Sequence, residues 1–377
     1  MRSAARAPGG AGRKGIGPAI PPSCSGRGSG AFIGGGGGGT NAAAGADSGV
    51  LSGLNNEACD TVSTIGGGGG NRVSSSGGGP DDTDSFIGGG AENAIDCTTA
   101  CEGDDAIAGG LSNAIDGGAG NSFVGAGNSN TVSAGAAAIA SGYENNVSAL
   151  EGFVGAGYTN KVSGEYGTVA GGYGNTASAT ESSIPGGAYN SAGGYASFAA
   201  GYHADADYAG SFVWSDNSAS STTKATAANE FLARAAGGVT FFTNSAMTTG
   251  VKVDPGSGTW SSVSDRNLKT GVEPINDATV LDRVASLPIS KWSYISERGV
   301  RHLGPMAQDF YAAFGIGEDN KHITSIDEDG VALAAIKALH AENGGLRAQL
   351  AIQKAALATQ QTQIKQLAAQ VAALRSR

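Results

Sequence analysis

Ser264 and Lys269 are the residues of this chain whose types and spacing could perform covalent chemistry. A serine hydroxyl is a poor nucleophile until a base removes its proton. Lysine can act as that base only when its pKa falls, which desolvation achieves. The pair therefore predicts serine chemistry in a site closed to water. A surface turn is the alternative explanation, because serine and lysine often lie this close by chance.

The elements expected around the pair favour the first interpretation. The sequence predicts a helix at about 277–286 and a strand at about 289–295. The segment 302–308 leads into another helix, and a further helix begins at Val331. A β-rich stretch at 211–263 precedes the serine, so the pair would lie where a β connector meets a small α+β domain.

This set of elements, from Ser264 to about Leu339, resembles the C-terminal intramolecular chaperone domain of phage endosialidases, tail spikes and tail fibres. It is also similar to the self-cleaving part of myelin regulatory factor. The resemblance implies a cut between Val263 and Ser264 once the chain has trimerised. It implies Ser264 as the nucleophile, Lys269 as the general base and Asp265 as a residue that positions the loop.

Two further residues match family-like positions, His302 and Gln308, and a structural role for each is the alternative. Nothing in the chain resembles the sialidase or depolymerase domain of those phage enzymes, because repeats occupy that place. We therefore expect at most a single-turnover self-cleavage and no external substrate.

A glycine followed three residues later by an asparagine recurs ten times between residues 38 and 190. Successive asparagines are 15, 15, 22, 20, 17, 15, 15, 15 and 15 residues apart. A period this regular predicts stacked coils rather than a globular core. The glycine fits a turn with positive φ, and asparagine bonds turn backbone locally, so stacked turns predict an asparagine ladder.

Two apolar columns accompany each asparagine and are expected to face inward as strand residues. The first column lies six residues before it: Val50, Ile65, Ile87, Ile107, Val124, Ile139, Val154, Val169 and Ile184. The second lies two residues after it: Ala58, Val73, Ile95, Ile115, Val132, Val147, Val162, Ala177 and Ala192.

Coils such as 122–132 resemble the left-handed parallel β-roll heads of trimeric autotransporter adhesins, and the resemblance covers about residues 31–210. It implies three parallel rolls packed side by side. The predicted fold is therefore mainly β: a left-handed parallel β-roll solenoid with coils of about 15 residues, then the α+β chaperone domain and a coiled coil. The longer spacings at 71–93 and 93–113 predict projecting loops that could contact a receptor.

The segment 331–377 carries a heptad repeat, which predicts a coiled coil. Its apolar core positions are Ile336, Leu339, Leu346, Leu350, Leu357, Ile364, Leu367, Val371 and Leu374, with Asn343, Gln353 and Gln360 as polar core positions. A parallel trimer fits the other two modules, and a dimer is the alternative.

Charge and composition argue against several classes of function and of targeting segment. Residues 31–210 carry 18 acidic residues against Arg72 and Lys161, and such a surface repels phosphate, so no nucleic-acid binding is expected. No apolar stretch is long enough for a transmembrane helix, and the basic segment 1–30 lacks the apolar core of a signal peptide and is expected to be disordered. No cofactor or metal is expected.

Four cysteines, Cys24, Cys59, Cys97 and Cys101, provide no metal-binding pattern. A small disulfide between Cys97 and Cys101 is one possibility, and free thiols are the other.

These features predict five segments: a tail at 1–30, the β-roll at 31–210, a connector at 211–263, the chaperone at 264–330 and the coiled coil at 331–377. We interpret the chain as a trimeric fibre at a cell surface, outside the cell or on a virion. It would be a bacterial adhesin or a phage tail fibre that binds an unidentified surface receptor, protein or glycan. The alternative from another class is a structural protein with an inert C-terminal module.

Overall fold

The structure is a computed structural model that describes residues 28–36, 40–75, 84–97, 103–116, 120–297 and 299–375. The chain forms two compact units, the first ending at Val239 and the second beginning at Thr240. The expected tail at 1–30 lies almost entirely outside the described residues. The choice between a Cys97–Cys101 disulfide and free thiols also falls outside them, because Cys101 is not among the described residues. Cys59 is disulfide-bonded, which the sequence did not predict.

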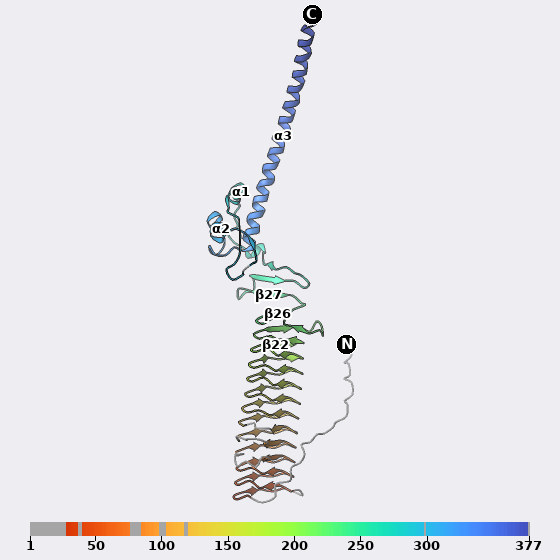
Figure 1. Cartoon of the computed structure of the whole chain (residues 1–377), viewed down its shortest axis with the longest axis vertical. Helices are drawn as coiled ribbons and strands as arrows, with labels where there is room; N and C mark the ends of the chain where they lie inside the picture. Colours follow the sequence, from red (N-terminus) through yellow and green to blue (C-terminus); the bar gives the residue numbers. More distant parts are fainter. Residues whose placement is uncertain are drawn as a thin grey trace. The chain divides into compact units, whose positions relative to one another are not determined.

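The first unit is a parallel β-solenoid in which the coils give short strands to two sheets, one strand to each sheet in most coils (Figure 1). We call them sheet 1 and sheet 2. Sheet 1 contains β1 (Phe32–Ile33), β3 (Gly49–Val50), β5 (Thr64–Ile65), β7 (Phe86–Ile87), β9 (Ala106–Ile107), β11 (Phe123–Val124), β13 (Ala138–Ile139), β15 (Phe153–Val154), β17 (Thr168–Val169), β19 (Ser183–Ile184), β20 (Gly187–Ala188), β22 (Phe198–Tyr202), β24 (Phe212–Ser215) and β26 (Phe231–Arg234).

Sheet 2 contains β2 (Ala42–Ala43), β4 (Glu57–Ala58), β6 (Arg72–Ser75), β8 (Ala94–Cys97), β10 (Ala114–Asp116), β12 (Thr131–Val132), β14 (Asn146–Val147), β16 (Lys161–Val162), β18 (Thr176–Ala177), β21 (Ser191–Ala192), β23 (Ala204–Asp205) and β25 (Thr223–Lys224). Equivalent residues pair from coil to coil, for example Val154 with Val169. The predicted parallel solenoid with coils of about 15 residues is therefore confirmed.

Both predicted apolar columns form the core between the sheets. Every residue of the two columns is buried, most with no exposed surface. β-branched side chains suit this place because they pack well on a pleated surface. The two columns interlock as one thin, continuous core rather than as separate clusters.

The predicted asparagine ladder is also confirmed. The Asn145 side chain is 1% exposed, and its Oδ1 accepts hydrogen bonds from the backbone N and the Nδ2 of Asn160, at 2.9 and 3.1 Å. Its Nδ2 donates to Asn130 Oδ1 and to the Gly157 carbonyl, both at 3.0 Å. The buried amide is thus satisfied by the coils above and below it, as a buried polar group must be.

Backbone geometry requires the turn glycine of each coil from Gly53 to Gly187. Gly157 has φ 108°, and a Cβ there would lie 2.2 Å from the Gly172 carbonyl oxygen. Only glycine adopts this conformation without strain and allows such a close approach between coils.

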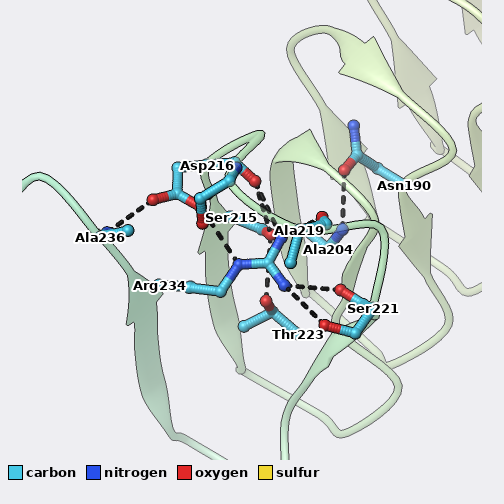
Figure 2. Close-up of polar contacts among 10 residues, drawn as sticks. Asn190, Ala204, Ser215, Asp216, Ala219, Ser221, Thr223, Arg234 and Ala236 are labelled. Atoms are coloured by element: carbon cyan, nitrogen blue, oxygen red, sulfur yellow. Dashed lines mark hydrogen bonds and ion pairs between the residues drawn. The ribbon is translucent and has the colours of Figure 1, made fainter.

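The solenoid extends beyond Gly210, where the asparagine period stops. β24 and β26 continue the ladder of sheet 1, with Val213 paired to Leu232, and β25 continues sheet 2. The parallel ladder needs only backbone groups and an inward apolar residue, so it persists after the asparagine is lost. At Ala204, the backbone N still donates to Asn190 Oδ1, at 2.9 Å, and the side-chain ladder ends there (Figure 2).

A polar clamp closes the last coil (Figure 2). The Arg234 guanidinium donates to the carbonyls of Asp216, Ala219 and Ser221 and to Asp216 Oδ1. Asp216 Oδ2 accepts from the Ala236 backbone N at 2.6 Å. The segment between β24 and β26 is therefore tied to the final strand.

The boundary between the units falls after the first residue of β27 (Val239–Phe242), which forms a three-stranded sheet with β28 (Gly250–Val253) and β29 (Ser261–Ser262). Then follow the 3-10 helix η1 (Arg266–Leu268), α1 (Asp277–Ser286), the antiparallel pair β30 (Ser290–Trp292) and β31 (His302–Gly304), α2 (Ala307–Phe314) and α3 (Ser325–Arg375). The helix expected at 277–286 is present with those bounds.

The long helix α3 begins six residues before the predicted Val331. Thr324 Oγ1 accepts from the Asp327 backbone N at 3.2 Å and donates to the Asp327 carboxylate at 2.7 Å. This pair works as a helix-capping arrangement, which fixes the earlier start. Near its N-terminus the helix packs against α1, where Ala338 is buried and Lys337 pairs with Asp277 at 2.7 Å.

Candidate autoproteolytic site

The candidate site lies where the three-stranded sheet ends. β28 and β29 are antiparallel, and the Val263 backbone N donates to the Gly250 carbonyl at 3.2 Å. Val263 is therefore the last residue held by the sheet, and Ser264 is the first residue of the loop that follows. The predicted cleavage point is the junction between a fixed strand and a turn.

A short capped turn brings the chain back toward the serine. Asp265 Oδ1 accepts from the backbone N of Asn267 at 2.9 Å and from its Nδ2 at 3.1 Å, which caps η1. The Lys269 backbone N then donates to the Arg266 carbonyl at 3.2 Å. An aspartate that bonds the backbone two residues later is a common way to build such a turn.

The turn places the two predicted chemical groups in contact. Lys269 Nζ donates to Ser264 Oγ at 2.7 Å. This separation is within the range for proton transfer between a nucleophile and its base. The structure thus brings Ser264 and Lys269 together and puts Asp265 in the turn that holds them, while the catalytic roles remain predictions.

Both side chains are exposed to solvent in the single chain, and Val263 is 40% exposed. A cavity of about 420 Å³ lies elsewhere in this unit, among α1, α2 and α3, and neither Ser264 nor Lys269 lines it. The pair therefore has its geometry already, but the single chain does not remove it from water.

His302 and Gln308 have other surroundings. His302 Nε2 lies 3.2 Å from Glu297 Oε2, and its ring stacks on Trp292 with a centroid distance of 4.6 Å. Gln308 is in the first turn of α2. For His302, these contacts support the structural alternative.

Sequence reasoning missed Asn267, whose backbone and side chain both bond Asp265. The Asp-x-Asn spacing was the available signal, since such a pair favours a local turn. It also missed Gly250, whose carbonyl fixes the residue before the predicted cut. A backbone contact between strands leaves no side-chain signature.

No helix among the described residues is long and apolar enough to cross a membrane. Nor do these residues contain a group of three or more His, Cys, Asp or Glu side chains that could hold a metal ion.

Comparison with known proteins connects this geometry to a family. Residues 264–315 match the family described as chaperone of endosialidase. The match begins at Ser264 itself and ends at Gly315, the C-cap of α2. A search of curated proteins found no match. The chain therefore joins a β-roll head to a C-terminal segment that matches the chaperone-of-endosialidase family.

Proposed function

We propose that this chain is a trimeric fibre whose C-terminal chaperone drives assembly and is then released by autoproteolysis before Ser264. The contact of 2.7 Å between Lys269 Nζ and Ser264 Oγ, at the first residue of the chaperone match, carries the proposal. Its position after a fixed strand suits a cut that separates the head from the chaperone.

Neutral Lys269 takes the hydroxyl proton of Ser264 while Oγ attacks the carbonyl carbon of Val263. The peptide C–N bond breaks, the amine of Ser264 takes up a proton, and an ester joins Val263 to Ser264 Oγ. Water then hydrolyses the ester and leaves a carboxylate on Val263.

The long helix supports self-association. All the apolar heptad residues of α3, including Leu350, Leu357 and Ile364, are exposed, with exposed fractions of 46–72%. An exposed apolar seam over many turns is unstable in water and is normally covered by equivalent helices. In our proposal, copies of this chain cover it as a parallel trimer. Closing the trimer would also remove Lys269 from water and activate it.

A fibre of this kind belongs on a virion or outside a cell, where its head would bind a surface receptor. The family match supports a tail-fibre-like role, and the repeats support an adhesin-like head. In a tail fibre and in an adhesin alike, the C-terminal chaperone would drive the assembly of the trimer.

The test is the mass of the expressed full-length chain. Cleavage gives fragments of 263 and 114 residues from the 377-residue chain. Ser264→Ala is expected to remain intact and still to trimerise by light scattering, because only the nucleophile is removed. Cleavage that persists in Ser264→Ala contradicts the nucleophile assignment. An uncut, trimeric wild type would favour the inert structural module instead.

A second arm tests the coupling to assembly. Leu357→Asp with Ile364→Asp puts charges into the α3 seam, far along the chain from the bond. We expect slower cleavage because the site would close less often. Full-rate cleavage in this double variant contradicts the coupling, and a double variant with Lys354→Asp and Lys365→Asp, away from the heptad core positions, is the matched control.

A further inference from the structure

The two sheets of the solenoid have different outer faces. The outward residues of sheet 1 are Phe32, Gly49, Thr64, Phe86, Ala106, Phe123, Ala138, Phe153, Thr168, Ser183, Phe198, Phe212 and Phe231. We call this set the phenylalanine face. None of these residues, all of which the structure describes, is charged.

Charged residues lie on the outer face of sheet 2 instead. Glu57, Arg72, Lys161, Asp205 and Lys224 occupy equivalent outward positions there. The segment that contains most of these coils has a net charge of −16, from 18 acidic and two basic residues. An acidic chain with one uncharged face can approach a copy of itself through that face without repulsion.

The phenylalanine face is also apolar and exposed. Phe86, Phe123 and Phe153 are 43, 43 and 40% exposed, and the small residues Ala106 and Ala138 separate them. With strands about 4.8 Å apart, the uncharged column is on the order of 55 Å long, and phenylalanine, alanine, glycine and hydroxyl side chains line it.

Aromatic stacking continues the face at its C-terminal end. The rings of Phe198 and Phe212 stack with centroids 4.4 Å apart, and those of Phe212 and Phe231 with centroids 4.8 Å apart. The uncharged surface is thus unbroken from the first coils to the last strand of the solenoid.

We propose that the phenylalanine face is the surface through which the solenoids of different copies pack against one another. This inference rests on the proposed function, because the apolar seam of α3 would assemble copies of the same chain and hold their solenoids at high local concentration. A second copy is therefore the occupant, and the charged face of sheet 2 is left toward solvent and receptor.

The test compares side chains with equal exposure in the single chain. Phe123 and Phe153 are 43 and 40% exposed, and Tyr166 is 45% exposed in a turn beside Glu151 and Glu165. Hydroxyl-radical labelling of the uncleaved, full-length Ser264→Ala protein, read by mass spectrometry alongside light scattering, is expected to spare the two phenylalanines and to label Tyr166. The Leu357→Asp, Ile364→Asp variant should restore labelling of the phenylalanines.

A trimer in which Phe123 and Phe153 are labelled as strongly as Tyr166 overturns this face and leaves the trimer proposal standing. A monomeric full-length chain overturns both. As a second measurement, Phe123→Asp with Phe153→Asp is expected to lower the melting temperature of the trimer more than Thr131→Asp with Lys161→Asp on sheet 2. If the two pairs of substitutions lower the melting temperature equally, the phenylalanine face is not the surface through which the copies pack.

Discussion

The contact between Ser264 and Lys269 depends on a five-residue separation and on the turn between them. Asp265 caps that turn through Asn267, so the lysine returns toward the serine although neither side chain is buried. Position is therefore provided locally, and reactivity has to come from desolvation, which lowers a lysine pKa. Mutations can therefore test the position of Lys269 and its desolvation separately.

Lys269→Met is expected to abolish cleavage before Ser264, because it keeps an unbranched side chain and removes the base. Lys269→Arg is expected to do the same, since a guanidinium does not lose its proton near neutral pH. Mass spectrometry of the purified chain measures both. Both variants should still form trimers, and normal cleavage in Lys269→Arg would show that this residue is not the base.

At the other end of the connector, the Asp216 carboxylate fixes the last coil of the solenoid by hydrogen bonds from Ser218, Arg234 and Ala236. Hydrogen bonds from the Ser218 hydroxyl, from the Ala236 backbone N and from Arg234 keep the pKa of Asp216 at about 2, below its usual value. Because the folded pKa is depressed, this carboxylate adds stability above the unfolded pKa of about 3.9, and the contribution is lost as the pH falls through about 2.

We expect Asp216→Asn to lower the melting temperature at pH 5 to 7, because the amide is neutral and cannot accept with the strength of a carboxylate. The difference from wild type should shrink as the pH is lowered toward 2. Thermal melts of both proteins across this range measure it. A difference that stays constant with pH would mean that the charge of Asp216 does not contribute.

Each coil is an element with very little core of its own. Its two inward side chains, such as Val154 and Val162, lie in register with the equivalent residues of the neighbouring coils and belong to one core shared by all the coils. Stability in such an array comes from the interfaces between repeats. A charge placed at an inward position of one coil therefore also destabilises the coils on both sides of it.

Val154→Asp is expected to destabilise the solenoid by roughly 3 kcal/mol or more, because it buries an unpaired charge. Lys161→Asp is the control, since Lys161 lies on the exposed face of sheet 2 and should change stability by no more than about 0.5 kcal/mol. Circular dichroism and melting curves compare the two. A wild-type melting curve for Val154→Asp would contradict its inward position.

On the scale of the whole molecule, a parallel solenoid is slow to assemble laterally. Its contacts between copies are long-range, and exposed apolar faces such as the phenylalanine face favour aggregation before they are paired. A C-terminal chaperone with a long apolar helix would gather the copies first, and its release would leave the assembled fibre in place.

Deleting residues 264–377 is expected to give monomeric or aggregated solenoid, because the proposed nucleus for association is removed. Light scattering and solubility of the shortened chain measure this, with uncleaved Ser264→Ala as the full-length control. Soluble trimers from the shortened chain would contradict a chaperone role for the deleted part.

The sequence by itself determined the repeating part of this protein. The glycine–asparagine period, the two apolar columns and the turn glycines follow from rules that act within one coil, and identical coils can stack in only a few ways. The helix at 277–286 was equally readable from its periodicity, and the structure adds the Asn276 cap, which the sequence interpretation did not use. The capping pair of Thr324 and Asp327 could have shown where α3 begins, but the heptad pattern alone did not contain it.

The tertiary structure alone decided where the pattern ends and which groups meet. The solenoid continues to Arg234 because backbone pairing persists without the asparagine, and the Arg234 clamp uses carbonyl groups that carry no residue identity. The distance of 2.7 Å between Lys269 and Ser264 depends on a turn whose closure requires the backbone angles of η1 and the anchoring of Val263 to Gly250. Contacts of this kind arise from how segments are placed in space, and residue types constrain that placement only weakly.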